Sequence, residues 1–266
     1  MRFRNTEDLN MLPIDIHTHT VASGHGTTDT IADLAKQAHK KGMTLLGISD
    51  HGPATPGSCK ESYFRSLKSA PRNRAGISVL YGAEANILNE RGALDISDEV
   101  LEGLDFCIAS IHPQSFRSPA YHRSSFWDRK QVTEDVEAAR HYNTEAYIRA
   151  MENPHVNVIG HPDDQHYPID RDALAEAAAK HNIIIEVNEA SLAPGGYRGD
   201  TRETMRRILN ACMKYRLPIL LSSDSHGAVS VGEAPLAEGL VAELCYPKEL
   251  ILNFMSVEDF IKVLQR

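Results

Sequence analysis

Short apolar runs alternate along the chain with segments in which apolar residues recur at helical spacing. Seven runs are predicted to be strands, and most are apolar at consecutive positions, as expected for strands covered on both faces. The predicted strands are Leu12–Ile16, Thr44–Ser49, Ser78–Gly82, Phe106–Ile111, Val156–Gly160, Ile183–Asn188 and Pro218–Ser223. Their alternation with helical segments predicts parallel crossover units.

Helical segments separate most of these strands. The helix that starts at Arg171 follows a predicted N-cap at Asp170, and Ser256 and Asp259 have the spacing of a capping box before a short closing helix. The longer predicted helices are Ile31–Lys41, Glu134–Met151, Arg171–His181 and Thr201–Tyr215. This order of elements fits either a barrel or a doubly wound open sheet.

Side chains that can bind metal distinguish between these two folds. An open sheet concentrates its ligands near one switch point, whereas a barrel gathers them from many strands around one mouth. Here six predicted strands carry such residues at their C-terminal ends, namely His17 with His19, His51, Glu84, His112, His161, and Asp224 with His226. The sequence therefore predicts an α/β fold built as a (β/α)7 barrel.

Composition adds limits on the setting of this barrel. The 266 residues suffice for a single barrel domain, with residues 1–11 as an N-terminal extension. The formal net charge of −8 argues against a general binder of nucleic acid or of membrane surfaces. No apolar run reaches the length of a membrane span or a signal peptide, and the four cysteines form no CxxC pair. We therefore expect a cytoplasmic protein with reduced thiols.

The thirteen histidines matter through their positions. His17 and His19 stand two residues apart on a predicted strand, so both imidazoles face the same side and can reach one ion. Such a pair alone also occurs on ordinary half-buried strands. Here His25 follows in a glycine-flanked loop, and Asp224 and His226 repeat the two-residue spacing. Nitrogen and oxygen donors at one barrel rim suit Zn²⁺, Mn²⁺ or Fe²⁺, which predicts a multinuclear metal site.

Six short motifs extend this prediction to a family. They are HTHT at 17–20, SDHG at 49–52, GAE at 82–84, IHP at 111–113, GHP at 160–162 and DSH at 224–226. Together they resemble the PHP family, named for polymerase and histidinol phosphatase domains, and within it the stand-alone bacterial phosphatases with a trinuclear zinc site. The resemblance runs from about Leu12 to the C-terminal end and implies a distorted (β/α)7 barrel.

The resemblance also implies how nine ligands divide among the ions. A first ion would bind His17, His19, Glu84 and Asp224; a second His25, His51 and His226; and a third His112 and His161, with Glu84 as the bridge. Two to three divalent ions per chain are implied, with zinc favoured over manganese or iron. Asp224, Glu84 and His226 are assigned to catalysis.

The predicted activity is that of a metal-dependent phosphoesterase, which hydrolyses its substrate by attack of a metal-bound hydroxide. Substrate phosphate should also meet cationic side chains. Arg117 and Arg123 lie in an aromatic-rich segment after His112, and Arg198 lies in a glycine-rich stretch at 194–199. The predicted partner is a small phosphorylated metabolite or nucleotide. A homo-oligomer stays open, with a trimer suggested by analogy with related phosphatases.

Three alternatives remain open from the sequence. A phosphodiesterase or 3′–5′ exonuclease of the PHP type is disfavoured by the acidic charge and by the lack of a polymerase domain. An amidohydrolase typically has a bridging carboxylated lysine, and no lysine stands at a predicted strand end. A non-catalytic metal-binding regulatory domain would be expected to have lost ligands, whereas all nine positions are filled.

Overall fold

Seven parallel strands form the centre of the fold in the computed structural model, which describes residues 11–123, 131–132 and 135–265, and no side chain from 122 to 134. The strands pair in the order β1-β3-β5-β6-β9-β10-β11. Their bounds are β1 Ile14–Asp15, β3 Leu45–Ile48, β5 Ile77–Asn86, β6 Phe106–Ser110, β9 Val158–Ile159, β10 Ile184–Asn188 and β11 Ile219–Ser222. All seven predicted strands are confirmed, and β5 continues beyond its predicted end at Gly82.

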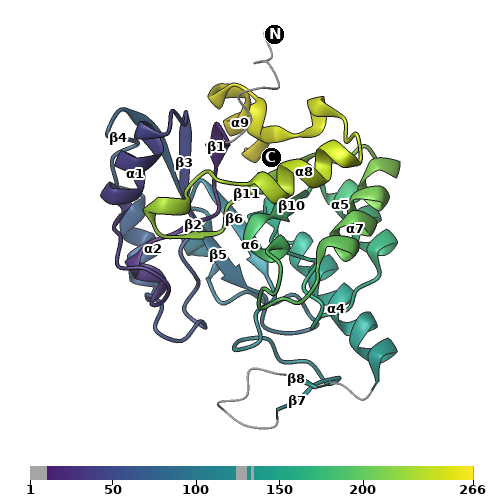
Figure 1. The fold of residues 1–266 in the computed structure, drawn as a ribbon. Helices are drawn as coiled ribbons and strands as arrows, with labels where there is room; N and C mark the ends of the chain where they lie inside the picture. Colours follow the sequence, from purple (N-terminus) through teal and green to yellow (C-terminus); the bar gives the residue numbers. More distant parts are fainter. Residues whose placement is uncertain (1–10, 124–130, 133–134, 266) are drawn as a thin grey trace.

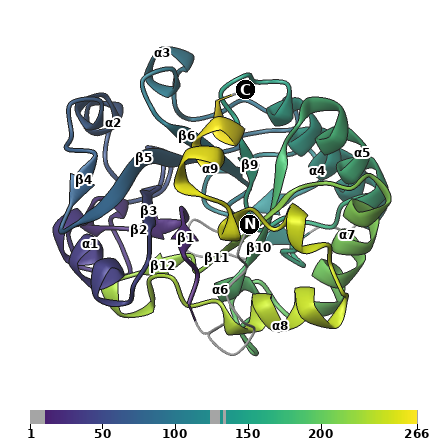
Figure 2. The same cartoon turned by 90° about the horizontal axis from the view of Figure 1, so that it is seen from above.

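The sheet curves into a barrel whose first and last strands, β1 and β11, meet along a seam (Figure 2). At one end of the seam, β2 (Thr18–His19) pairs in parallel with β12 (Ser225–His226). Further along, the Asn253 side chain lies between the two strands. Its Nδ2 donates to the carbonyls of Ile14 and Leu221 at 2.8 and 2.7 Å, and its Oδ1 accepts from the Leu221 amide at 2.8 Å. These contacts close the ring, and the predicted distorted (β/α)7 barrel is confirmed.

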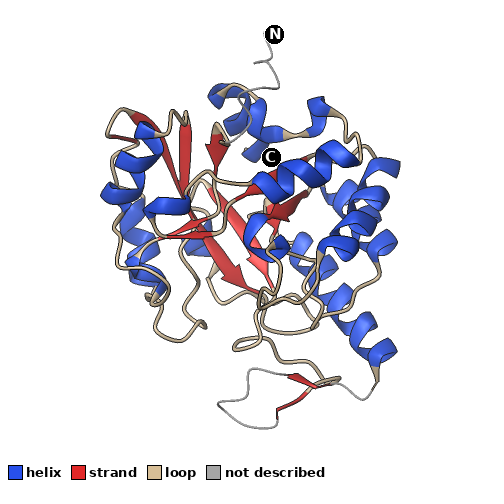
Figure 3. Cartoon of the chain, viewed as in Figure 1, coloured by secondary structure: helices blue, strands red, loops and turns tan. Residues whose placement is uncertain are grey.

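Helices form the outer layer around the strands (Figure 3). Those with a sequence signal have bounds close to the predicted ones: α1 Ile31–Lys40, α4 Val136–Met151, α5 Arg171–His181, α7 Arg202–Lys214 and α9 Val257–Leu264. The side chains of Asp170 and Ser256 cap α5 and α9 as predicted. The described residues form four more helices, α2 Glu61–Leu67, α3 Asp98–Leu101, α6 Glu189–Leu192 and α8 Pro235–Glu243. Three of these are too short to show a period, and α8 contains Gly239, a poor helix former.

Short strands and single helical turns lie at the two ends of the barrel. β4 (Asn73–Arg74) pairs antiparallel with β5, and the antiparallel pair β7 (His122–Arg123) and β8 (Gln131–Val132) projects from the end opposite to α9 (Figure 1). Single turns of 3-10 helix are η1 Val21–Ser23, η2 Ala228–Ser230, η3 Lys248–Leu250 and η4 Leu252–Phe254. Within the described ranges, no helix is both long and apolar enough to cross a membrane. Except for Met11, the predicted extension at 1–11 falls outside the described residues.

Two apolar cores hold the barrel together. The larger one lies between the strands and the outer helices, and the smaller one fills the barrel interior at the N-terminal ends of the strands. Ile14, Leu45 and Phe106 contribute to this inner core from three different strands. Phe260 and Leu264 of α9 pack against them from outside, so α9 covers this end of the barrel (Figure 2). Polar side chains are consequently left to the opposite end, where the strands finish.

Candidate metal centre

The nine predicted ligands come together at the C-terminal end of the barrel. Each lies on a strand end or in the loop that follows: His17 between β1 and β2, His19 in β2, His25 after η1, His51 after β3, Glu84 in β5, His112 after β6, His161 after β9, Asp224 after β11 and His226 in β12. Seven of them are buried, His226 is partly buried and His25 is exposed at the edge. Residues far apart in the sequence therefore form one cluster, as the strand-end pattern predicts.

Two of these residues have unusual backbone conformations. His161 has φ of 29° and Asp224 has φ of 51°, in the left-handed region that non-glycine residues seldom adopt. Both follow the end of a strand by two residues. Strained backbone of this kind persists where the surrounding structure enforces it, and it is concentrated at functional sites. The strain here coincides with the points where the chain leaves the barrel and presents a candidate ligand.

Glu84 is the central carboxylate of the cluster. Its Oε2 lies 2.6 Å from His51 Nδ1, and its Oε1 lies 2.9 Å from His161 Nε2 and 3.2 Å from His112 Nε2. The two oxygens therefore face different imidazoles. A carboxylate in this position can serve two cations at once.

Asp224 is the second carboxylate. Its Oδ1 lies 3.1 Å from His19 Nε2 and 3.5 Å from His17 Nε2, while its Oδ2 accepts from Arg198 at 3.2 Å. His25 completes the edge of the cluster, with its ring centroid 5.0 Å from that of His226. Asp224 thus contacts His17 and His19 through one carboxylate oxygen and the Arg198 guanidinium through the other.

Among the side chains that the structure describes, three groups could each hold a metal ion. Within each group the ligand atoms lie within 4.8 Å of one another: His17, His19 and Asp224; His19, His51 and His226; and His51, Glu84 and His112. The first group agrees with the ligand set implied by the resemblance. The second group contains His19 where the implied set has His25, and the third contains His51 where the implied set has His161. The division of ligands among individual ions stays a prediction.

Several buried nitrogen and oxygen atoms of the cluster are available to coordinate a metal ion. The Nε2 atoms of His17, His112 and His226, Nδ1 of His51 and Oε2 of Glu84 are buried and form no hydrogen bond of good geometry among the described residues, although ion-pair contacts such as the 2.6 Å between His51 Nδ1 and Glu84 Oε2 bring some of them together. Buried polar atoms are otherwise almost always paired, because an unpaired one costs free energy. Imidazole and carboxylate together form the ligand set of zinc and related transition metals. The residues present therefore fit a bound divalent ion.

The charges of the cluster also favour metal binding. Burial opposes ionisation of Glu84 and Asp224, but the neighbouring imidazoles outweigh it and hold the pKa of each carboxyl well below its usual range. Burial, reinforced by His51 and His226, lowers the pKa of His25 to about 4. The pKa of His19 is lowered in the same way. His17 is the exception, because burial is outweighed there by Glu186, Asp224 and Glu84, which raise its pKa well above the usual range. Ionised carboxylates and neutral imidazoles are the forms that bind metal, so His17 has to release a proton when it binds an ion.

Glu186 is a member of this site that sequence reasoning missed. It lies within β10, fully buried, and its Oε1 is 2.5 Å from His17 Nδ1. The signal was an acidic residue inside a mostly apolar strand, because charged side chains are almost never fully buried unless they are paired. Glu186 contacts His17 at Nδ1, the ring nitrogen opposite the one that faces the other candidate ligands. Glu186 does not belong to any of the three candidate metal-binding groups.

The three arginines predicted to bind phosphate lie in different surroundings. Arg198 lines the cluster's pocket and donates to Asp224. The Arg117 guanidinium donates to the carbonyls of Phe116 and Gln114, so it is folded onto its own loop. The side chain of Arg123 falls outside the described part of the chain. Arg198 is thus the one of the three that the structure places at the cluster.

Two hollows meet at His226. The smaller, of about 140 Å³, is lined by His25, His51, His112, Pro113, Gln114, Asp164, Tyr197, Arg198 and His226. The larger and more open one, of about 650 Å³, runs along Gly26–Asp29 and Gly227–Ser230. His166, next to the smaller hollow, bonds to Asp164 at 2.8 Å and stacks on Tyr197. The cluster is therefore accessible from outside through polar walls.

Comparison with known sequences agrees with the motifs. The PHP domain profile matches residues 15–190. The chain belongs to the PHP domain family. A relative from Clostridium botulinum (strain Hall), named a probable phosphatase, is 35% identical over 240 residues, which cover 90% of this chain and 89% of the relative. Another probable phosphatase, from Caldanaerobacter subterraneus subsp. tengcongensis, is 36% identical over 254 residues, 96% of this chain and 91% of the relative. The prediction of a phosphatase-class PHP enzyme is confirmed.

Solved structures agree on the fold. The histidinol phosphate phosphatase of Lactococcus lactis, crystallised with zinc, L-histidinol and phosphate, superposes with a TM-score of 0.59 at 18% identity and covers 86% of this PHP chain and 92% of its own. A chain of an archaeal ribonuclease P complex with mature tRNA superposes with a TM-score of 0.52 at 14% identity, covering 95% and 90%. At such identities the likeness shows that the fold is shared, and says nothing about the substrate.

Proposed function

We propose that this PHP enzyme is a phosphomonoesterase that hydrolyses a small phosphorylated metabolite or nucleotide with two or three divalent ions, zinc in preference to manganese or iron. The observation that carries the proposal is the position of Arg198. Its guanidinium lies in the same small hollow as four of the clustered histidines and 3.2 Å from Asp224. A fixed cation beside a metal-binding cluster is the arrangement that recognises a phosphoryl group.

The shape of the site supports a small, terminal phosphate. A hollow of about 140 Å³ is well below the usual size of a pocket for a whole ligand, so it suits the phosphoryl group alone. The open hollow of about 650 Å³ on the other side of His226 is available to the rest of the substrate. With a net charge of −8, the chain also lacks the general basic character that favours long nucleic acids.

The protein's own residues divide the work. Divalent ions bound here would activate water near neutral pH and oppose the negative charge of the phosphoryl oxygens. Glu84 would bridge two of them, Asp224 would complete one and His226 another, which makes these three the residues proposed for catalysis. Arg198 is held by Asp224 and has further N–H groups to donate to phosphoryl oxygens. Burial lowers the pKa of Arg198, but its acidic neighbours outweigh this effect and raise it, so the side chain stays cationic.

A paired assay tests the proposal. The protein is stripped with a chelator, reloaded with Zn²⁺ or Mn²⁺, and given p-nitrophenyl phosphate or bis(p-nitrophenyl) phosphate. We expect hydrolysis of the monoester alone, lost on stripping and restored by metal. Arg198→Gln should raise KM for the monoester, whereas Arg207→Gln, which breaks only an exposed ion pair with Glu203, should not. Faster hydrolysis of the diester would identify a phosphodiesterase, and metal binding without turnover would identify a non-catalytic domain.

A further inference from the structure

Three imidazoles of the cluster contact a neighbouring side chain through Nδ1, the nitrogen that points away from the other candidate ligands. His17, His19 and His112 each use Nδ1 for a contact with the surrounding protein, while Nε2 faces Glu84 or Asp224. A hydrogen bond at Nδ1 fixes the tautomer that leaves the Nε2 lone pair available to an ion. The acceptor at Nδ1 also sets how basic Nε2 is, and a carboxylate acceptor makes it more basic than a neutral one.

His17 has the strongest of these partners. Its Nδ1 lies 2.5 Å from Oε1 of Glu186, in direct contact with a buried carboxylate. Glu186 is itself fixed, because it accepts from the Ser222 hydroxyl at 2.5 Å, the His161 amide at 2.7 Å and the Asn188 side chain at 3.1 Å. One carboxylate therefore holds the ring of one candidate ligand and the backbone of another.

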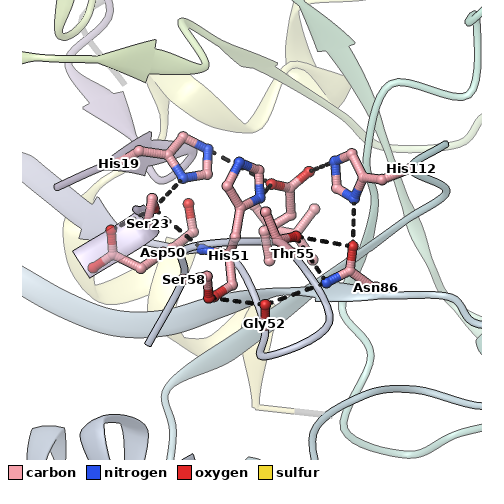
Figure 4. A network of polar contacts seen from close by, with 12 residues as sticks. His19, Ser23, Asp50, His51, Gly52, Thr55, Ser58, Asn86 and His112 are labelled. Atoms are coloured by element: carbon pink, nitrogen blue, oxygen red, sulfur yellow. Dashed lines mark hydrogen bonds and ion pairs between the residues drawn. The ribbon is translucent and has the colours of Figure 1, made fainter. Parts of the chain in front are cut away.

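His19 reaches a carboxylate through one intermediate group. Its Nδ1 lies 3.0 Å from the Ser23 hydroxyl, which donates to Oδ1 of Asp50 at 2.7 Å (Figure 4). Asp50 is anchored by the Thr20 amide at 2.7 Å and the Tyr63 hydroxyl at 2.6 Å. The negative charge is thus one hydroxyl further from the ring than it is for His17.

His112 is arranged in the same way with an amide in the middle. Its Nδ1 lies 2.8 Å from Oδ1 of Asn86 (Figure 4). Asn86 Nδ2 in turn donates to Oδ2 of Asp95 at 2.6 Å. In contrast, Nδ1 of His25 and of His226 lies 3.2 Å from a backbone carbonyl. The rings therefore form a graded series, from a direct carboxylate through a relayed one to a neutral carbonyl.

We propose that Glu186 is the positioning residue of this centre: by holding His17 directly, it makes the ion at His17, His19 and Asp224 the most tightly bound, and ions whose histidine rings have only relayed or neutral partners are held more weakly. The inference rests on the proposed function, since it requires metal at these ligands. The bound ions would then differ in affinity, and this difference would come from Glu186, which binds no ion itself. Outer partners of metal ligands typically contribute about 10- to 100-fold in affinity.

The test measures metal content directly. Wild type, Glu186→Gln and Asp50→Asn are equilibrated in chelator-buffered Zn²⁺ series, and bound zinc is counted by mass spectrometry. We expect the affinity for the tightest ion to fall about 10- to 100-fold in Glu186→Gln and by a smaller factor in Asp50→Asn. The matched control is Glu189→Gln at the start of α6, three residues after Glu186. The Glu189 carboxylate accepts only from backbone amides at the start of α8. This variant should bind zinc like wild type.

The rise in melting temperature on adding zinc distinguishes positioning from plain structural support. We expect this rise to be reduced in Glu186→Gln. A lower melting temperature of the metal-free variant with an unchanged rise and unchanged affinity would overturn the inference, as would equal losses in Glu186→Gln and Asp50→Asn. If Glu186→Gln does not fold, Glu186→Asp keeps the buried charge but not the reach to His17, and unchanged affinity there would also overturn it.

The two proposals fail differently. A wild-type protein that takes up no zinc would contradict the proposed function and remove the basis for any affinity order. A wild-type protein that binds zinc in the expected order but hydrolyses no phosphomonoester would contradict the proposed function and leave the role of Glu186 standing.

Discussion

The two ends of the barrel interior are built from the same strands and are opposite in chemistry. At the N-terminal end, Ile14, Leu45 and Phe106 form an apolar core that α9 covers. At the C-terminal end, the same strands lead into histidines and carboxylates with buried atoms that lack a partner among the described residues. The first end lowers the free energy of the fold by excluding water, whereas the second keeps unpaired polar atoms whose cost is offset when a ligand binds. Because the two ends are separate, we expect that stability and chemistry can be altered independently in this protein.

The largest expected effect comes from the polar end. Asp224→Ala removes the carboxylate that faces two imidazoles and Arg198, so we expect phosphatase activity to fall by more than about 100-fold, beyond what the loss of an outer partner costs. Steady-state kinetics with zinc in excess measures this. Asp172→Ala, which removes an exposed ion pair with Lys214, is the control and should keep full activity. Equal activity of both variants would place the chemistry elsewhere.

The apolar end should respond in stability alone. Phe260 of α9 is fully buried, and Phe260→Ala should lower the free energy of unfolding by about 3–5 kcal/mol. Ile261→Ala, at a partly exposed position of the same helix, should cost less. Urea unfolding measures both, and bound zinc per folded chain should stay the same. Loss of zinc in Phe260→Ala would show that the two ends are coupled.

The seam between the two ends should be of intermediate sensitivity. Asn253→Ala removes three hydrogen bonds and leaves backbone groups of Ile14 and Leu221 unpaired in a buried place. We expect a loss of about 3 kcal/mol in the free energy of unfolding, because each of the three unpaired backbone groups costs at least about 1 kcal/mol. Calorimetry would measure this loss. A cost below about 0.5 kcal/mol would mean that the seam relaxes or takes up water.

The smallest effect tests a carboxylate that belongs to neither end. Burial, with Glu189 nearby, raises the pKa of Glu238 from 4.5 to about 7. The folded state then holds a proton that the unfolded state has lost, so the wild type loses stability as the pH rises from about 4.5 to 7. Glu238→Gln should gain at most about 1 kcal/mol above pH 7, since the group is half exposed, and nothing below pH 4.5. A gain that is the same at all pH values would contradict this cause.

Much of the barrel could be predicted because its local and global signals agree. Strands covered on both faces are apolar at consecutive positions, and ligands such as His112 and Asp224 follow them directly. Sequence position then reports position in space, since parallel strands bring their C-terminal ends to one rim. Arg198, predicted from its glycine-rich stretch to meet substrate phosphate, has its guanidinium beside the cluster.

What escaped prediction depends on contacts between distant segments. Glu186 lies on a mostly apolar strand, and its contacts with His17 and the His161 amide reveal its place in the cluster. His17 and His19 were expected on one strand, but the ladder is interrupted between them and β2 pairs instead with β12. Nothing in the local sequence around Arg117 indicates that its guanidinium bonds to its own loop.

The seam has a consequence for how the protein is made. Asn253 and Ile14, which meet there, are 239 residues apart in the chain. A contact between residues so far apart raises the contact order, and the ring cannot be completed on the ribosome until the chain has emerged through Asn253. Until then, β1 and β11 present open strand edges, which readily pair with those of other chains. Chains interrupted before Asn253 should therefore aggregate rather than persist as a smaller folded barrel, and refolding yield should fall as protein concentration rises.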